Sequence, residues 1–308
     1  MRKVNVLVSL ITTDNDFQME QALAAEETAR RLGLNTSVIF AGNDAVNQSQ
    51  QLLNAIHNRG ERPDAILVEP VGTGMSQVAK AAVEAGIAWG IVNREVDYLP
   101  GLRRTANAPV FAVTTDHENV GAIQARQFET LLGGKEGGVL YIEGPSAGTV
   151  ARLRSVGMNS AKPPQVIVNT IRGDWTEQSG WHAVTSWLAL STSRKFNIRI
   201  IGSQNDAMSI GARKAFQEMP NADERRKWLT LPFTGCDGAP EGGQKWVRDG
   251  LLAATVITPP PMGTAIQLLH EAIQSGSQPP EWTVTTSESF PPIDRLGRKA
   301  GWARGHHA

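Results

Sequence analysis

Short runs of apolar and β-branched residues alternate along the chain with Ala-rich segments of helical spacing. The first run covers residues 4–11. The segment after it starts near Phe17, repeats apolar residues every three or four positions and stops at Gly33. A short apolar run predicts a buried strand, and the periodic segment after it predicts an amphipathic helix. Because the pair repeats along the chain, we expect a parallel α/β fold.

The repeats form two series of similar rhythm. The first series continues with strands at 36–40, 65–69 and 88–92. The second has strands at 110–114, 138–143, 165–170, 198–201, 229–233 and 253–256, with helices at about 119–132, 149–159, 176–188, 207–217 and 241–250. Three prolines at 259–261 then bar helix and central strand alike. The helix at about 263–275 and the strand near 281–286 are too small for a domain, so they must complete one of the series.

The composition indicates about two globular domains and disfavours several functional classes. At roughly 100 to 200 residues per domain, 308 residues suggest about two. The 30 Lys and Arg balance 30 Asp and Glu, so no global field attracts nucleic acid. The single cysteine, Cys236, excludes an internal disulfide and a cysteine-based zinc cluster. The run at 4–11 is too short and polar for an export signal, and no window reaches the ~18 apolar residues that span a bilayer.

Polar and aromatic residues collect after the predicted strands. In parallel α/β sheets, ligands bind at the carboxyl ends of the strands, where loops and helix N-termini converge. Amide, carboxylate and guanidinium groups can each bond neighbouring hydroxyls in pairs, and an aromatic face covers the apolar side of a sugar ring. The pattern therefore favours a sugar or another neutral polyol as ligand. The residues are Asp14, Asn15, Asp16, Phe17, Glu69, Asn93, Arg94, Glu95, Asp116, Arg152, Asp174, Trp175, Asn205, Asp206, Asp237 and Thr258.

Simpler interpretations exist for individual members of this set. Residues such as Asp16 and Thr149 could be helix caps, Arg94 and Arg152 could be surface arginines, and Trp175 could belong to the core. The set carries more weight than its members because each lies at a predicted strand end or at the start of the following helix.

An enzyme is disfavoured because the sequence signatures of catalysis are missing. The chain has no G-x-S-x-G elbow, no H-E-x-x-H helix and no Walker sequence. Gly72 and Gly74 follow a strand, but Gln77 stands where a dinucleotide fingerprint needs its third glycine. Asp14 and Asp16 lack the remaining ligands of a calcium loop. We therefore expect no catalysis, no cofactor and no metal site.

As an ordered series, the motifs resemble those of the ribose-type periplasmic sugar-binding proteins. These are the type I solute-binding components of ABC importers, and they share their fold with the effector domains of LacI-type repressors. The resemblance covers residues 4–290. It is carried by Asp14-Asn15-Asp16-Phe17, Glu69-Pro70-Val71, Val92-Asn93-Arg94, Thr115-Asp116, Glu143-Gly144-Pro145 with Ala151-Arg152, Gly173-Asp174-Trp175, Gln204-Asn205-Asp206-Ala207-Met208 and the segment 250–256.

This resemblance implies the domain organisation. The family has two similar Rossmann-like lobes with parallel sheets, joined by a three-crossover hinge in the type I periplasmic binding protein fold. Here the crossovers would lie near Thr115, Thr258 and Thr286. The N-terminal lobe would comprise 1–115 plus 259–286, and the C-terminal lobe 116–258 plus 287–308.

The resemblance also implies which residues contact the ligand. Phe17 and Trp175 would come from opposite lobes and stack on the two faces of a sugar ring. Ribose-like binders usually carry Asp at the position of Asn93, Gln at that of Thr258, an aromatic at that of Cys236 and Asn at that of Glu69. A different pentose or hexose, a polyol or a furanosyl signalling molecule would fit as well as ribose. The implied ligand-binding residues are Asp14, Asn15, Phe17, Glu69, Asn93, Arg94, Arg152, Trp175, Asn205, Asp237 and Thr258.

The implied function is that of a non-enzymatic solute-binding protein. It would capture a monosaccharide or related polyol between two lobes by hinge closure and deliver it to an ABC importer. The alternative is a sugar or signal-molecule sensor that partners a membrane receptor or regulator. The family resemblance implies a monomer in the periplasm or cell envelope, with an ABC permease or membrane sensor as partner. Because the chain shows no export signal, a cytoplasmic location is the alternative. No helix-turn-helix precedes the first strand, so we expect no nucleic acid partner.

Overall fold

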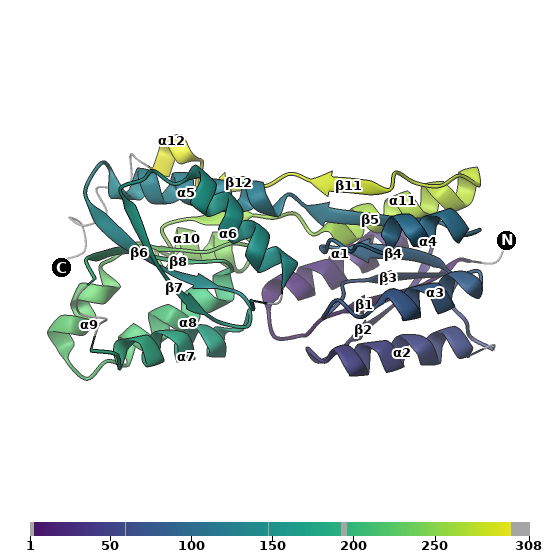
Figure 1. The fold of residues 1–308 in the computed structure, drawn as a ribbon, viewed down its shortest axis with the longest axis horizontal. Helices are drawn as coiled ribbons and strands as arrows, with labels where there is room; N and C mark the ends of the chain where they lie inside the picture. The colour runs from purple at the N-terminus through teal and green to yellow at the C-terminus, as the bar shows by residue number, and fades with distance from the viewer. Residues whose placement is uncertain (1–2, 59, 147, 192–195, 297–308) are drawn as a thin grey trace. The chain divides into compact units, whose positions relative to one another are not determined.

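The chain folds as two compact units in a computed structural model that describes residues 3–58, 60–146, 148–191 and 196–296. Unit 1 comprises Met1–Thr115 and Pro259–Thr285, and unit 2 comprises Asp116–Thr258 and Thr286–Ala308. The chain therefore passes between the units after Thr115, Thr258 and Thr285 (Figure 1). Each unit has a parallel sheet with helices, so the predicted α/β class is confirmed. Residues 297–308, the end of the predicted C-terminal lobe, lie outside the described residues.

Unit 1 is built on a parallel sheet whose strand order is β11-β5-β4-β3-β1-β2. The late strand β11 pairs with β5, where Trp282 is in register with Ala112. The segment after the second passage therefore completes this sheet. Strands β3 and β4 are buried along their whole length, as expected for central parallel strands covered on both faces. The strands are β1 (Asn5–Leu10), β2 (Asn35–Phe40), β3 (Ala65–Val68), β4 (Ala88–Val92), β5 (Val110–Thr115) and β11 (Trp282–Thr285).

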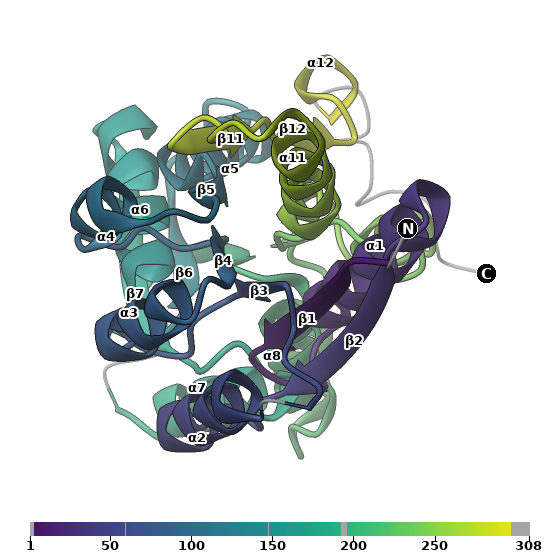
Figure 2. The ribbon, with the colours of Figure 1, turned by 90° about the vertical axis from the view of Figure 1, so that its right-hand side faces the viewer.

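Helices cover both faces of this sheet (Figure 2). On one face α1 and α11 pack over a core that includes Ala25, Phe111 and Leu269, and on the other α2, α3 and α4 pack over Leu52 and Trp89. Each fully buried large apolar side chain contributes about 1.5 to 3 kcal/mol. The helices are α1 (Asp16–Leu32), α2 (Ala45–His57), α3 (Ser76–Glu84), α4 (Leu99–Thr105) and α11 (Pro261–Ser275).

Unit 2 has a parallel sheet with strand order β7-β6-β8-β9 and an antiparallel pair of β10 with β12. Side chains alternate along β6: Tyr141 packs with α5 and α6, and Ile142 packs with α7 and α8. The strands are β6 (Gly137–Glu143), β7 (Val166–Arg172), β8 (Ile198–Ser203), β9 (Phe233–Thr234), β10 (Thr255–Ile257) and β12 (Glu288–Phe290). The helices are α5 (His117–Leu132), α6 (Thr149–Ala161), α7 (Glu177–Leu188), α8 (Asp206–Gln217), α9 (Ala222–Leu229), α10 (Gly243–Arg248) and α12 (Ile293–Leu296).

Small residues let α5 and α6 approach closely. A Cβ placed on Gly157 would lie 1.8 Å from the backbone oxygen of Glu118, and one on Gly121 would lie 2.0 Å from that of Arg154. Any larger residue at either position would push the two helices apart. The glycines therefore set the position of α6, which carries Arg154 into the interior of unit 2.

Two predictions about secondary structure are wrong. The strand expected at 229–233 is short, because α9 runs to Leu229 and β9 covers Phe233–Thr234. The side chain of Asn221 caps α9, and Trp228 stacks on Phe216, which together stabilise the helix. The proline segment does not exclude a helix, since α11 begins at Pro261. A first-turn residue needs no donated backbone hydrogen bond, so proline is compatible there.

Among the described residues, none of the helices is both long enough and apolar enough to span a bilayer.

Candidate functional site

The carboxyl end of β3 in unit 1 carries a buried acidic side chain, Glu69. Its side chain is 2% exposed. Oε2 accepts hydrogen bonds from Gln18 Nε2 at 2.9 Å and from Gln21 Nε2 at 3.4 Å. Oε1 accepts one from Asn93 Nδ2 at 2.8 Å and lies 3.9 Å from Arg94 Nη2. A buried carboxylate needs such partners, because an unpaired charge is costly away from water.

Asn93 and Arg94 follow β4 and take their positions from this carboxylate. Asn93 has φ of 58°, a left-handed conformation that asparagine tolerates better than most residues. The Arg94 side chain is 13% exposed, so most of it is buried beside Glu69. The carboxyl ends of β3 and β4 thus bring an acid, an amide and a guanidinium together.

The start of α1 supplies the other predicted residues of unit 1. The side chain of Asn15 caps the helix by accepting from the backbone N–H of Gln18 at 3.0 Å. The cap is therefore Asn15 and not the suggested Asp16, which is the first helical residue. Phe17 is buried, with 8% of its surface exposed, whereas Asp14 is exposed. Asn15 thus has a structural role, whatever it contributes to binding.

Unit 2 has a second polar cluster, built around Arg154 of α6. The side chain is 3% exposed, and its Nη1 lies 3.8 Å from Asp237 Oδ1 and donates to the backbone oxygen of Gln204. The guanidinium carbon lies 5.8 Å from the ring centroid of Trp175, within the range of a cation–π contact. One buried arginine thus joins an acid and an aromatic ring that the sequence places in separate motifs.

Trp175 is held in an unfavourable backbone conformation. Its φ is 78°, its backbone oxygen accepts from Asn205 Nδ2 at 2.7 Å, and its ring packs on Gly144. A Cβ on Gly144 would lie 2.2 Å from the indole, so only glycine admits this ring. Asn205 also caps α8 by accepting from the backbone N–H of Met208. Asn205 therefore fixes both the helix and the tryptophan.

A buried amide and a buried acid support this cluster. Gln204 accepts from the backbone N–H of Gly144 and donates to Ala151 O and Ser155 Oγ. The two carboxylate oxygens of Asp206 accept from Thr255 Oγ1 and from the backbone N–H of Gly238.

Thr258 is also buried, next to Asp237. Its backbone N–H donates to the backbone oxygen of Asp237 at 3.0 Å. Thr258 therefore has a fixed position after β10, and it is the last residue of unit 2 before the chain passes back to unit 1.

The structure does not bring Arg152 into this cluster. Arg152 is exposed and lines a groove of about 530 Å³ between α6 and the ends of β6 and β7. Within that groove Glu143 accepts from Ser155 Oγ at 2.5 Å and lies 3.4 Å from Arg172 Nη2. Two residues along the helix, the buried Arg154 is the arginine that this cluster contains, whereas the sequence argument chose Arg152 as the ligand contact. Residues two apart point in different directions on a helix, and Val150 and Met158, each four residues from Arg154, place Arg154 on the buried face of α6.

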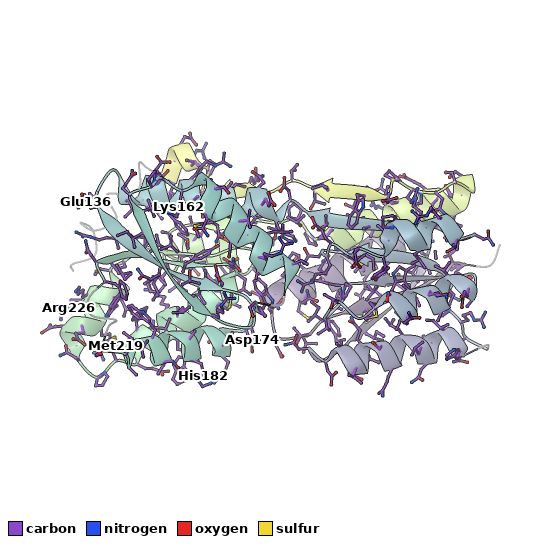
Figure 3. The ribbon with its side chains drawn as sticks, in the orientation of Figure 1. Glu136, Lys162, Asp174, His182, Met219 and Arg226 are labelled. Atoms are coloured by element: carbon purple, nitrogen blue, oxygen red, sulfur yellow. The ribbon has the colours of Figure 1, made fainter. Side chains whose placement is uncertain are left out.

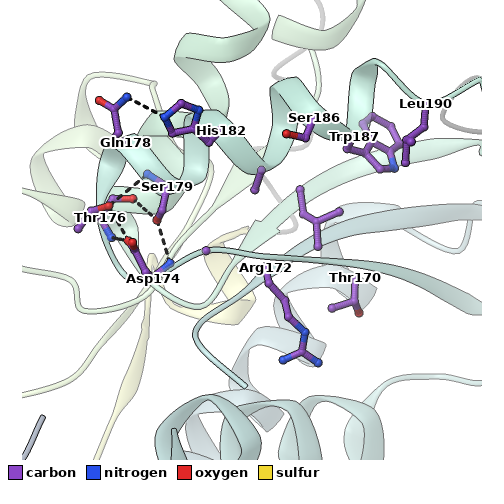
Figure 4. Close-up of a pocket in the computed structure, with 13 residues that line it drawn as sticks. Thr170, Arg172, Asp174, Thr176, Gln178, Ser179, His182, Ser186, Trp187 and Leu190 are labelled. Atoms are coloured by element: carbon purple, nitrogen blue, oxygen red, sulfur yellow. Dashed lines mark hydrogen bonds between the residues drawn. The ribbon is translucent and has the colours of Figure 1, made fainter. Parts of the chain in front are cut away.

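The larger groove of unit 2, about 800 Å³, contains Asp174 of the strand-end set but none of the ligand-binding residues that the resemblance implies (Figure 4). It lies between the end of β7 and α7, and its lining includes Asp174 and His182, both labelled in Figure 3. Burial raises the pKa of Asp174, but hydrogen bonds from Thr176 and Ser179 outweigh it and hold that pKa below its usual value. Asp174, Thr176 and Ser179 thus form a local hydrogen-bond network at one end of the groove.

Unusual backbone conformations concentrate at the predicted site residues. Among the described residues, the non-glycine positions with positive φ are Asn43, Asn93, Trp175 and Asp237. Three of these four were predicted from the sequence as ligand-binding residues. Such conformations are held in place by surrounding contacts and cluster at functional sites.

Two buried side chains of unit 2, Cys236 and Tyr141, are kept in their neutral forms. Burial raises the pKa of the Cys236 thiol, so it stays protonated and unreactive at neutral pH. Burial likewise raises the pKa of the Tyr141 hydroxyl, which donates to Gln124 Oε1. In the part of the chain that the structure describes, no group of acidic, His and Cys side chains could hold a metal ion.

Sequence reasoning missed four residues that complete the clusters. Arg152 was chosen in place of Arg154, and Gln204 was noted at a strand end but not chosen as a site residue. Gln18 and Gln21 lie three apart on α1, which places them on one face, but glutamine is common on exposed helix surfaces. A signal was present, since both occur on the face that also carries Ala22 and Ala25, buried like them.

Two curated proteins of Escherichia coli illustrate what this chain is similar to in sequence. A D-allose-binding periplasmic protein is 28% identical over 276 residues, covering 87% of this chain and 84% of that protein. A galactofuranose-binding protein is 25% identical over 292 residues, covering 92% and 86%.

Solved structures agree in fold. A periplasmic solute-binding protein of an ABC transporter from Actinobacillus succinogenes, with bound D-allose, matches with a TM-score of 0.80 at 20% identity, covering 96% of this chain and 100% of that one. A galactofuranose-binding protein matches with a TM-score of 0.79 at 23% identity, covering 97% and 98%. The family model of the periplasmic binding protein domain matches residues 6–277, and the chain belongs to that family.

Proposed function

We propose that this chain is a solute-binding protein that captures a monosaccharide or a related polyol and delivers it to an ABC importer. The ligand would be bound by side chains from the strand ends of both units. In unit 1 these are Asn93 and Arg94, supported by Glu69, and in unit 2 they are Arg154, Trp175 and Asp237. Arg154 takes the place that sequence reasoning gave to Arg152.

The observation that carries this proposal is the coincidence of chemistry and strain. Asn93, Trp175 and Asp237 were chosen from the sequence for their polar or aromatic character, and each has a positive φ. Strain of about 1 to 3 kcal/mol per residue persists only where surrounding contacts impose it. Such rigid backbone positions favour binding, because donors and acceptors that are already fixed lose little conformational entropy when a ligand binds.

The groups suit a neutral ligand with several hydroxyls. Arg94 and Arg154 offer planar sets of donors, Asp237 offers acceptors, and the face of Trp175 suits the apolar C–H side of a ring. A hydrogen bond to a charged group contributes about 1.5 to 3 kcal/mol, and leaving a buried partner unpaired costs a similar amount. The site would therefore select by hydroxyl pattern more than by ligand size.

Hinge closure would couple binding to transport. A ligand that touches both units stabilises the arrangement in which both sets of contacts form. A membrane permease would recognise that arrangement, and this mode of action places the protein in the periplasm or cell envelope. Relatives named for D-allose and galactofuranose binding support a sugar as the solute.

The direct test is calorimetric titration of the purified protein with D-allose, D-ribose, D-galactose, L-arabinose and myo-inositol. We expect saturable binding of at least one of them and a change in tryptophan fluorescence. The chain has 8 tryptophans, so the variant Trp175→Phe serves as control and should remove most of the change. If none of these compounds binds and none raises the melting temperature, the proposal is wrong.

A further inference from the structure

Glu69 cannot easily be a ligand contact itself, although the sequence argument named it as one. Its side chain is 2% exposed, and donors from α1 and from the end of β4 surround both oxygens. A ligand hydroxyl would have to displace one of them. The contacts of Glu69 therefore indicate a different role.

The two glutamines that donate to Glu69 are locked in orientation. The backbone N–H of Ile11 donates to Gln18 Oε1 at 2.9 Å, and the backbone N–H of Met262 donates to Gln21 Oε1 at 2.9 Å. In each amide the oxygen is thus committed to a backbone donor, so the NH₂ group must face Glu69. Oε2 of residue 69 must consequently be an acceptor.

The other oxygen of Glu69 fixes the amide of Asn93. Oε1 accepts from Asn93 Nδ2 at 2.8 Å, which leaves the carbonyl Oδ1 on the opposite branch of that amide. The same Oε1 lies 3.9 Å from Arg94 Nη2. Residue 69 must therefore be an acceptor on both sides, which a carboxylate provides and a carboxamide does not.

We propose that Glu69 is a positioning residue that determines ligand specificity by fixing the amide orientation of Asn93 beside Arg94. This inference rests on the proposed function. A ligand hydroxyl that accepts from Arg94 still needs an acceptor for its own proton, and Asn93 Oδ1 is that acceptor. The subsite then selects a hydroxyl that both accepts and donates over an ether or deoxy position.

The variant Glu69→Gln should invert this arrangement. Its Oε1 has to face Gln18 and Gln21, so its NH₂ group meets Asn93 Nδ2, donor against donor. Rotation of the Asn93 amide relieves the conflict but presents NH₂ in place of the carbonyl. A hydroxyl bound by Arg94 then meets two donors and no acceptor, and affinity should fall at least about tenfold.

Exchanging acid and amide between the two positions should restore the pattern. In Glu69→Gln/Asn93→Asp, Gln at 69 accepts from both α1 glutamines and donates to Asp at 93, whose other oxygen is again an acceptor. Affinity should recover to within about threefold of wild type. Asn93→Asp alone sets two carboxylates side by side and should lower the melting temperature by roughly 5 °C.

The experiment measures melting temperature without ligand and calorimetric affinity for the four proteins: wild type, both single variants and the exchange variant. The affinity probe is the tightest binder of wild type among D-allose, D-ribose, D-galactose, L-arabinose and myo-inositol. Gln48→Met is the stability control. Gln48 is buried in the same unit and donates to Ser9 Oγ and to the backbone oxygen of Glu69, not to its carboxylate. It should lower the melting temperature and keep wild-type affinity.

Recovery of both affinity and melting temperature in the exchange variant supports the proposal. Wild-type affinity in Glu69→Gln, or an exchange variant that binds no better than the weaker single variant, overturns it. If wild type binds none of the five probes, the proposed function fails, and with it the specificity role. The melting temperatures then still decide whether Glu69 holds Asn93, since absence of recovery would contradict the geometry itself.

Discussion

The two units bury polar groups at the ends of their strands in different ways. In unit 1 the central group is a buried charge, the carboxylate of Glu69, which accepts hydrogen bonds from α1 and from Asn93 after β4. In unit 2 a neutral group, the amide of Gln204, forms the buried hydrogen bonds. The Arg154–Asp237 pair lies beside the half-buried ring of Trp175. Both arrangements hold a guanidinium in a fixed position.

The difference shows how a similar sheet can position the same chemical group by opposite means. In unit 1 the acid is buried and orients its neighbours, whereas in unit 2 the buried arginine itself links an acid, an aromatic ring and a backbone oxygen. Removing Arg154 should therefore destabilise unit 2 because a largely buried acid loses a compensating charge. Removing the carboxylate of Glu69 should destabilise unit 1 because the donors around it lose their acceptor.

The largest effect is expected from removing the buried arginine of unit 2. Arg154→Ala leaves Asp237 without its cationic partner and should lower the free energy of unfolding by about 3 to 5 kcal/mol. Arg152→Ala, two residues away and exposed, should change it by less than about 0.5 kcal/mol. Urea unfolding of both variants measures this difference. An equal loss of unfolding free energy in the two variants would contradict the central role of Arg154.

Two buried glycines with close side-chain neighbours, one in each unit, are expected to have the next largest effect. In Gly144→Ala the new Cβ would lie 2.2 Å from the Trp175 ring, and in Gly90→Ala it would lie 2.4 Å from Leu67 in the core of unit 1. Each should destabilise by about 1 to 3 kcal/mol. The ligand affinity should fall in Gly144→Ala alone, because only that ring belongs to the proposed site. Titration of the two variants with the same sugar separates them, and matching affinities would place Trp175 outside the site.

The asparagine caps offer a smaller comparison. Asn15 caps α1 and Asn205 caps α8, so replacing either by alanine should destabilise by about 1 kcal/mol. Asn205→Ala also releases the backbone oxygen of Trp175 and should therefore be the more damaging of the two for ligand affinity. Thermal unfolding measures the stability of each variant, and calorimetric titration measures its ligand affinity. A larger affinity loss in Asn15→Ala than in Asn205→Ala would contradict the prediction.

The smallest effect concerns Asp174, in the groove of unit 2. Its pKa is lower in the folded state than in the unfolded chain, so it stabilises the protein above the unfolded pKa of about 3.9. That stabilisation is lost as the pH falls through the folded pKa. Asp174→Asn should therefore be less stable than wild type at pH 7 and approach it at pH 3. Melting curves at the two values test the sign, and a difference that grows toward pH 3 would contradict it.

The fold could be predicted because its signals are local and repeated. Buried runs such as Ala65–Val68 alternate with periodic helices, and Gly33 marks a helix end with φ of 72°. The failures have local causes too. Leu229 and Phe233 look alike as apolar residues, but the cap at Asn221 keeps the first in a helix.

The positions of the candidate residues along the fold were predictable, but their contacts were not. Glu69, Asn93, Trp175 and Asp237 were chosen because they follow predicted strands, and each of them follows a strand in the structure. Whether a side chain faces solvent or another side chain depends on rotation about a helix and on tertiary contacts. The sequence argument overlooked the apolar spacing of Val150 and Met158 that favours Arg154 over Arg152. It could not show that glutamines enclose Glu69, because those contacts are tertiary.

The central claim is that one sugar or polyol is bound by strand-end side chains of both units. A crystal structure of the protein with the tightest-binding monosaccharide tests it directly. The account predicts ligand density in contact with Asn93, Arg94 and Arg154, with its ring against Trp175. Density confined to the groove between β7 and α7, or to residues of a single unit, would contradict it.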